Sequence, residues 1–196
     1  MNEQDLKKQI AREYYNTIYG AKINFASYDI CEKMPTIISF ISLTIGVLGL
    51  VYEVFNSKDL SAAMLIIGII GLMLKTREEQ KNVYKEAAIN LLNISKSLEQ
   101  LHSKIDLNKS NEDKEGYYTS LSAQQKLHSG ISQPSPVFLA SWYAHYKLFS
   151  EHNVKWMCEE LNLKWTDKCP LSFRITILIT LIITLFVIIY QAQNCS

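Results

Sequence analysis

The sequence lacks the motifs that usually carry catalysis, metal binding or redox chemistry. It contains no GxSxG, GxGxxG, HExxH or phosphate-binding loop motif. Its 4 cysteines, Cys31, Cys158, Cys169 and Cys195, include no CxxC pair, which argues against a zinc knuckle. We therefore expect a protein that is not an enzyme and that holds no metal and no cofactor.

An excess of charge of one sign is also missing. The chain has 20 Lys and Arg against 19 Asp and Glu, so its formal net charge is +1. A near-neutral surface has no overall attraction for a phosphate backbone, and we expect no direct binding of nucleic acid. With only 7 Gly and 4 Pro among 196 residues, the chain is neither collagen-like nor of low complexity.

What the sequence does contain is three apolar runs, at residues 34–55, 60–74 and 171–190. Together they hold only two charged residues, Glu53 and Arg174. About 20 helical residues span the ~30 Å hydrocarbon layer of a bilayer, so the first and third runs are long enough. The second would extend only about 22 Å and needs help from flanking basic residues, unless it is the core helix of a soluble protein. We predict an all-α membrane protein with three spans, in contact with membrane lipid.

Basic residues predict the topology of these spans. Five Lys or Arg lie in residues 1–33, four follow the second run between positions 75 and 85, and the last six residues carry no charge. Because cytoplasmic flanks are enriched in Lys and Arg, we expect the N-terminal segment and residues 75–170 in the cytoplasm. The turn at 56–59 and the C-terminus would then lie outside.

The predicted cytoplasmic segments carry a heptad pattern. Apolar residues after the second run recur in steps of three and four: Tyr84, Ala87, Leu91, Ile94, Leu98, Leu101 and Ile105. Segment 1–33 repeats the pattern more weakly from Tyr14 to Tyr28. With no helix breaker after Leu60, we expect 60–74 to continue as 75–105 in one straight helix that packs antiparallel on the first as a coiled-coil-like stalk. The pairing could lie within one protomer or between protomers.

Two further segments precede the third run. Residues 106–136 are polar and rich in Ser and Asn, and we expect a flexible linker with at most a short helix at 119–127. Residues 137–165 predict an amphipathic helix whose aromatic face includes Phe138, Trp142, Phe149 and Trp156. That face would pack on the stalk or would form a partner surface.

Small and polar residues are spaced along the apolar runs. They form a line in the first run (Ser39, Ser42, Gly46, Gly49), a second line (Gly68, Gly71) and a stripe in the third run (Ser172, Thr176, Thr180, Thr184). Small residues let helices approach closely, so these lines would either close the hairpin or face another protomer or a pore. At the tip, Glu53 is expected to pair with Lys58.

This layout resembles the SLATT family (SMODS- and SLOG-associating two-transmembrane effectors), bacterial proteins associated with nucleotide-signalling and retron defence operons. The resemblance covers about residues 1–105: a charged N-terminal helix, a close hairpin with Gly-spaced helices, and a long helix after it. It implies a place in the bacterial inner membrane and homo-oligomerisation when infection is sensed. It also implies operon partners, either a reverse transcriptase with its non-coding RNA or a nucleotide cyclase. The run at 171–190 departs from the two-span pattern.

The function predicted from these features is that of a toxic effector of antiphage defence. Its hairpins would associate through the small residues and permeabilise or depolarise the inner membrane, which leads to abortive infection. Two other classes stay open. One is a non-toxic anchor or scaffold that recruits a cytosolic enzyme or ribonucleoprotein through its cytoplasmic helices. The other is a small transporter subunit or chaperone, which the lack of a charged or broken helix at the midplane disfavours.

Overall fold

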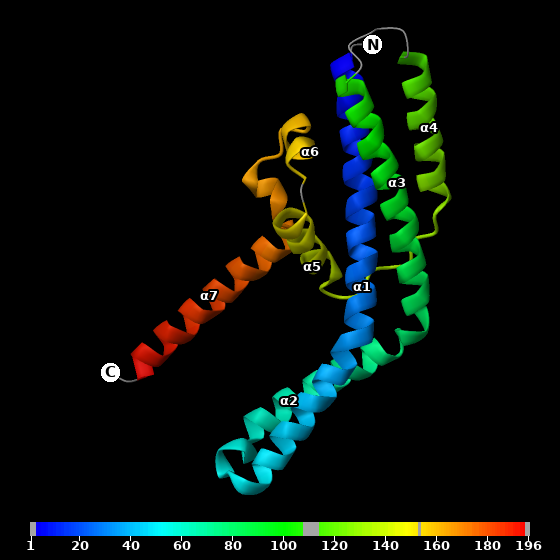
Figure 1. Cartoon of the computed structure of the whole chain (residues 1–196). Helices are drawn as coiled ribbons and strands as arrows, with labels where there is room; N and C mark the ends of the chain where they lie inside the picture. Colours follow the sequence, from blue (N-terminus) through cyan, green and yellow to red (C-terminus); the bar gives the residue numbers. More distant parts are fainter. Residues whose placement is uncertain (1–2, 108–113, 153, 195–196) are drawn as a thin grey trace.

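The computed structural model describes residues 3–107, 114–152 and 154–194, and within them every regular element is a helix (Figure 1). The elements follow the chain as α1 (Glu3–Val51), η1 (Glu53–Asn56), α2 (Lys58–Lys75), η2 (Glu78–Gln80), α3 (Lys81–Leu107), α4 (Lys114–Gly130), α5 (Ala140–Tyr146), η4 (Lys147–Glu151), α6 (Lys155–Glu160), η5 (Trp165–Lys168) and α7 (Leu171–Asn194). The prediction of an all-helical protein is confirmed.

Helix α1 is continuous over 49 residues and joins the predicted N-terminal segment to the first apolar run. Pro35 lies inside it without ending it. The predicted boundary between residues 33 and 34 is therefore not a break in the helix. It marks where the side chains of α1 change from mostly packed to mostly exposed. Buried residues are frequent from Leu6 to Cys31, and Ile38 is the last of them. We call residues 34–75 the hairpin, and the helices packed on the first half of α1 the body.

The body core forms where α3 runs back along α1 in the opposite direction (Figure 1). All seven heptad residues from Tyr84 to Ile105 are buried, none of them more than 7% exposed. Ile94, Leu98, Leu101 and Ile105 share one core cluster with residues of α1, among them Leu6, Ile10, Tyr14 and Ile18. In this structure the heptad face of α3 is thus covered by its own chain.

The expected straight helix from Leu60 to Ile105 is wrong. Helix α2 ends at Lys75, and the segment from Glu78 to Ile105 is bent from it by 40°. The bend comes from tightened turns, in which the Arg77 N–H donates to the Leu74 carbonyl and the Gln80 N–H to the Arg77 carbonyl. No proline is needed for this break. It lets the exposed apolar α2 and the buried face of α3 point in different directions.

The expected flexible linker is wrong for residues 114–130, which form α4. This helix exceeds the short one expected at 119–127, while residues 108–113 lie outside the described part of the chain. Leu121 is 3% exposed in the body core, and Tyr117 and Tyr118 pack against the same cluster. These three apolar anchors, packed on one core cluster, hold a segment whose composition alone predicts no stable packing.

The single helix expected at 137–165 is also wrong. Helix α5 continues into a short π-helical turn, η4, which ends at Glu151, and α6 begins only at Lys155. The fully buried residues of segment 137–165 are not the predicted aromatic ones. Among them are Ala140, Ala144, Leu148 and Met157. Since alanines let α5 approach α1 closely, the large aromatics are displaced outward or to its ends.

By length and composition, α1 is the one helix among the described residues that alone could cross a membrane. Helix α2 meets the same criterion when taken together with the bent segment that follows it. In α7 the apolar stretch Leu171–Phe186 is shorter. The structure therefore supports one span or two on this basis, and three remains a prediction.

Candidate functional site

The candidate site is the hairpin, because its surface is apolar and largely uncovered. Phe40, Leu50, Leu65 and Leu72 are each more than 60% exposed. A soluble protein would bury such a surface, and a continuous patch of this kind indicates contact with lipid or with another chain. The few polar or small groups on it are therefore the residues whose geometry decides what the hairpin can bind.

An open groove of about 470 Å³ separates α1 from α2 towards the tip of the hairpin. Its walls include Ser42, Gly46 and Gly49 from α1 and Ser61 and Met64 from α2. Three of the four predicted small residues of the first run thus line a common groove. They do not bring the two helices of one hairpin into close contact at this level.

The glycines of the hairpin divide into two kinds. A Cβ at Gly71 would lie 3.2 Å from Ile38 Cγ2, and one at Gly49 would lie 3.6 Å from the Phe55 carbonyl oxygen. A Cβ at Gly46 or Gly68 would meet nothing within 4 Å. Gly71 therefore serves the close approach of α2 to α1 at the base, whereas Gly46 faces the open groove and Gly68 leaves room on the surface of α2.

The remaining predicted hairpin residues do not form the expected contacts. Within the described chain no ion pair joins Glu53 to Lys58, and both residues are exposed. The Ser39 hydroxyl donates to the Pro35 carbonyl, 2.9 Å away, and lies near the base of the hairpin with Cys31 and Lys75. The expected pair at the tip is therefore not formed in this structure.

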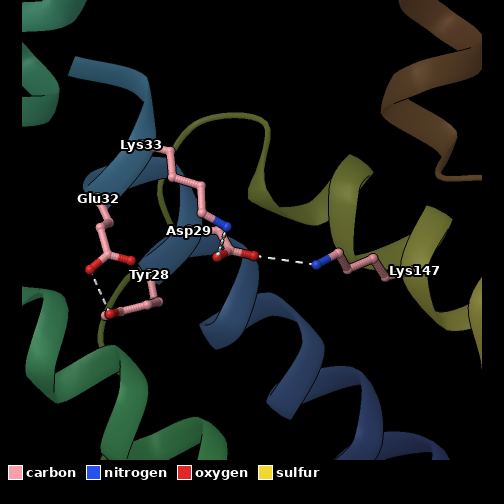
Figure 2. Close-up of polar contacts among 5 residues, drawn as sticks. All are labelled: Tyr28, Asp29, Glu32, Lys33 and Lys147. Carbon is pink, nitrogen blue, oxygen red and sulfur yellow. Dashed lines mark hydrogen bonds and ion pairs between the residues drawn. The ribbon is translucent and has the colours of Figure 1, made fainter. Parts of the chain in front are cut away.

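A charged cluster lies where α1 leaves the body, just before the hairpin (Figure 2). The Asp29 carboxylate accepts from Lys33 Nζ at 2.8 Å and from Lys147 Nζ of η4 at 3.3 Å. One turn along, the Tyr28 hydroxyl donates to Glu32 at 2.7 Å. Burial acts to raise the pKa of Asp29, but the two ammonium groups outweigh it and lower that pKa below its usual value. The cluster ties η4 to α1 directly above the hairpin.

The hydroxyls of the predicted stripe in the third run bond mainly within their own helix. The hydroxyls of Thr176, Thr180 and Thr184 each donate to the carbonyl four residues earlier, at 2.8–2.9 Å. Only Ser172 makes a contact outside α7, where its Oγ accepts from Trp142 Nε1 at 2.9 Å. The stripe therefore presents no free hydroxyl row at these three threonines.

The predicted aromatic partner surface is divided by the structure. Trp156 packs into the body, with ring centroids 4.8 Å from Tyr14 and 4.3 Å from His102, and Phe149 packs against the same core. Phe138 is 77% exposed, and Trp142 meets Phe173 at the start of α7. Two of the four residues are thus structural, and the other two remain on the surface.

The family model for the SMODS and SLOG-associating 2TM effector domain 6 matches residues 1–177. The chain belongs to this family. SLATT domains are effector domains associated with defence systems. Searches of the curated proteins and of the solved structures give no match.

The matched range places the SLATT domain on the described fold. It includes the hairpin and the whole body and ends seven residues into α7. The two-transmembrane description fits the α1–α2 hairpin. By length and composition, α1 alone could span a membrane, and α2 could do so together with the bent segment that follows it. Together, the family and the long apolar α1 indicate membrane association.

Several contacts of the SLATT body were missed by sequence reasoning. His128 of α4 lies 2.6 Å from a Glu13 carboxylate oxygen of α1, and Tyr14 Oη lies 3.3 Å from His152 Nε2. His145 stacks edge-on against Tyr19. The Asp29–Lys33 spacing of four residues was a readable signal for an ion pair. No local pattern marks His128 or His152 as a partner of a residue more than 110 positions away.

The histidines and cysteines do not form a metal centre in the part of the chain that the structure describes. His145 and His152 instead pack against α1, and burial lowers the pKa of both rings. Burial likewise raises the pKa of the Cys31 and Cys158 thiols, which favours their unreactive form.

Proposed function

We propose that this SLATT protein is a membrane effector of bacterial defence that oligomerises through its hairpin and permeabilises the inner membrane when triggered. The observation that carries the proposal is the pair of open glycines. Gly46 and Gly68 have no neighbour within 4 Å of a Cβ position, so they serve no close contact inside the hairpin. Small residues on an exposed apolar helix suit close packing by a second helix.

The groove supports the same proposal. It is lined by Ser42, Asn56 and Ser61 as well as by apolar residues, so its wall is partly polar. A single hairpin encloses no lumen, and a conducting path would need several copies around a common axis. Packing through Gly46 and Gly68 would then turn polar groups of neighbouring grooves towards one another. No catalytic step is part of this mechanism.

The body is the element on which a trigger would act. It is joined to the hairpin by the continuous α1 and by the bent connection from α2 to α3. A partner that repacks α3, α4 or α5 would shift the hairpin directly. Such a switch requires states that differ by only a few kcal/mol, because a ligand shifts an equilibrium only by its differential affinity. Products of neighbouring genes, such as a nucleotide cyclase or a reverse transcriptase, are the proposed source of the trigger.

The proposed topology has the body in the cytoplasm, the hairpin tip outside and α7 as a third span. Its support is the basic flanks at Lys75 and Arg77, both exposed at the base of the hairpin. A cysteine-accessibility experiment on intact cells tests it. Because Cys195 would also lie outside, both variants carry a Cys195→Ser change. In that background a Ser57→Cys substitution at the tip should react with a membrane-impermeant maleimide, and a Ser97→Cys substitution on α3 should not.

Membrane potential in cells that express the full chain tests the function itself. Depolarisation by the full chain, alone or with its neighbouring genes, supports the effector. Cells that keep their potential under both conditions, with the protein present in the membrane, would overturn it and favour the scaffold.

A further inference from the structure

Helix α5 packs on α1 through its alanines and leaves aromatic side chains exposed at its ends. Ala140 and Ala144 are fully buried in the cluster that also holds Ala26 and Cys31 of α1. Phe138, just before the helix, is 77% exposed, and Tyr146, its last residue, is 59% exposed. In a helix that faces water, the reverse distribution is expected, because aromatic burial contributes most to the core. The outer side of α5 is therefore suited to a surrounding other than water.

The outward aromatics are held in place at both ends of α5. The Val137 N–H donates to Ser27 Oγ at 3.2 Å, and Lys147 pairs with Asp29 beyond the other end (Figure 2). Between Val137 and Ala140, Leu139 adopts the left-handed backbone conformation, with φ of 67°. For a residue with a branched side chain this conformation is costly and persists only when its surroundings enforce it. It leaves Leu139 42% exposed beside Phe138.

The contacts that flank α5 fall close to the start of the hairpin. Val137 bonds to Ser27 and Lys147 to Asp29, and the apolar part of α1 begins at Met34. Within α5, His145 contacts Tyr19, farther from the hairpin. Five helical residues correspond to about 7.5 Å along the axis. The polar headgroup layer on each side of a bilayer is about 5–8 Å thick. The segment that begins α5 thus lies near the level of the headgroups when the hairpin is in the membrane.

The outer side of α5 is also continuous with the apolar α7. Trp142 donates to Ser172 Oγ, and its ring meets Phe173 at 5.2 Å between centroids. Beyond this contact the described α7 side chains are exposed, Leu171 and Phe186 among them. A lysine with an exposed side chain, Lys33, stands at the same level on α1. Tryptophan and tyrosine flanked by cations are the residues enriched at membrane–water interfaces.

We infer that the outer side of α5 binds the phospholipid interface of the cytoplasmic leaflet, with Phe138 and Leu139 inserted among the headgroup ends of the acyl chains. We call Phe138, Leu139, Trp142 and Tyr146 the interfacial face. The inference rests on the proposed placement of the hairpin in the membrane. It adds a second membrane contact, which keeps the body seated on the bilayer while α1 crosses it. A helix with one apolar face lies in this layer at a depth of about 5–10 Å.

Tryptophan quenching by brominated lipids tests this inference on the full chain in phosphatidylcholine and phosphatidylglycerol vesicles. The chain has 3 tryptophans, at positions 142, 156 and 165, and a Trp156→Phe, Trp165→Phe variant leaves Trp142 as the probe. A second probe, Phe138→Trp with all three native tryptophans changed to Phe, lies away from the α7 contact. The matched control keeps only Trp156, which packs on Tyr14 and His102 in the body.

Both interfacial probes should lose fluorescence in lipids brominated near the headgroup end of the chain, and lose less in lipids brominated near the chain terminus. The Trp156 control should keep its fluorescence in both. Interfacial probes that are not quenched by bromine but are quenched by aqueous iodide would overturn the inference, because the face would then lie in water. Probes shielded from both quenchers until the protein is diluted would also overturn it, because a second copy would then cover the face.

The same measurement separates this inference from the proposed function. Quenching reports only where α5 lies, whereas depolarisation of cells reports what the hairpin does. Quenching without any depolarisation leaves the interfacial face intact and removes the effector mechanism. Depolarisation without quenching would support the effector mechanism and overturn the interfacial face.

Discussion

The Glu13 carboxylate and the His128 ring lie 2.6 Å apart, although 115 positions separate them in the sequence. This contact joins α4 to the first half of α1, and both side chains are largely buried, at 13% and 21% exposure. It turns a segment with few apolar residues into part of the body. Because few apolar residues of α4 pack on the body, we expect this polar contact to contribute much of the free energy that holds α4 in place.

A His128→Leu substitution should therefore loosen α4 without unfolding the body. The free energy of local opening of α4 should fall by about 1.5–3 kcal/mol, the range for a lost hydrogen bond to a charged group. Hydrogen exchange of the α4 amides measures it, with Ser129→Ala as the control, since the Ser129 hydroxyl bonds only to its own helix at Lys126. Unchanged exchange in α4 would show that Leu121 and the two tyrosines hold the helix alone.

The Asp29 cluster should give the body an acid-sensitive contact. The pKa of Asp29 is lower in the folded protein than its ordinary value of 3.8, so the unfolded state binds the proton more readily. The stabilisation is thus fully present above the ordinary pKa and is lost as pH falls through the folded pKa. An Asp29→Asn variant should lack this part of the pH dependence of thermal unfolding in detergent. Asp59→Asn, at an exposed position of the hairpin tip, is the matched control and should keep it.

Two half-buried histidines, His145 and His152, should make the packing of α5 and η4 on α1 sensitive to milder acid. Burial lowers the pKa of His145, and burial together with the Lys22 ammonium lowers that of His152, although Glu99 opposes this. The folded state therefore keeps both rings neutral after the unfolded segment begins to take up protons, so stability falls as pH drops below about 6.5. The protection of residues 140–151 against hydrogen exchange, measured relative to the intrinsic exchange rate at each pH, should fall between about pH 7.5 and pH 5.5.

A His145→Gln, His152→Gln variant separates titration from other effects of acid. The protection of residues 140–151 in this variant should no longer change over that interval, because glutamine does not titrate. His128→Gln is the control, since it leaves both rings facing Tyr19 and Tyr14 in place. A loss of protection that persists in the double variant would assign the pH dependence to groups other than these two rings.

Residue patterns predicted the parts of the fold that repeat a local rule. The heptad from Tyr84 to Ile105 marks positions that are all buried, because a regular helix places them on one side. The break after Lys75 and the helix at 114–130 could not be read in this way. Neither has a local signal such as proline or an apolar periodicity, and both follow from which neighbour each segment finds in the folded chain.

The candidate site was predictable in composition and not in geometry. The sequence identifies Gly46, Gly49, Gly68 and Gly71 as small residues in apolar helices, and all four appear equivalent there. Only the fold separates Gly71, against Ile38, from Gly46 and Gly68, which face open space. Likewise, the aromatic residues at 138–156 appear in the sequence to share one helical face. In the structure the helix breaks after Glu151, and Trp156 packs against Tyr14 in the core.

The open glycines give the sharpest test of the effector mechanism. Gly46→Leu and Gly68→Leu add bulk where nothing lies within 4 Å, so each hairpin should still fold and insert. Close packing between copies should be blocked, and depolarisation of expressing cells should fall at least tenfold, which corresponds to about 1.4 kcal/mol in the association equilibrium. Ala62→Leu makes the same change at an exposed position of α2 outside the groove and should keep full activity. Depolarisation that persists in both glycine variants, with equal protein in the membrane, would refute the hypothesis that the hairpins pack through these glycines. A leucine at either position would hold neighbouring helix backbones apart.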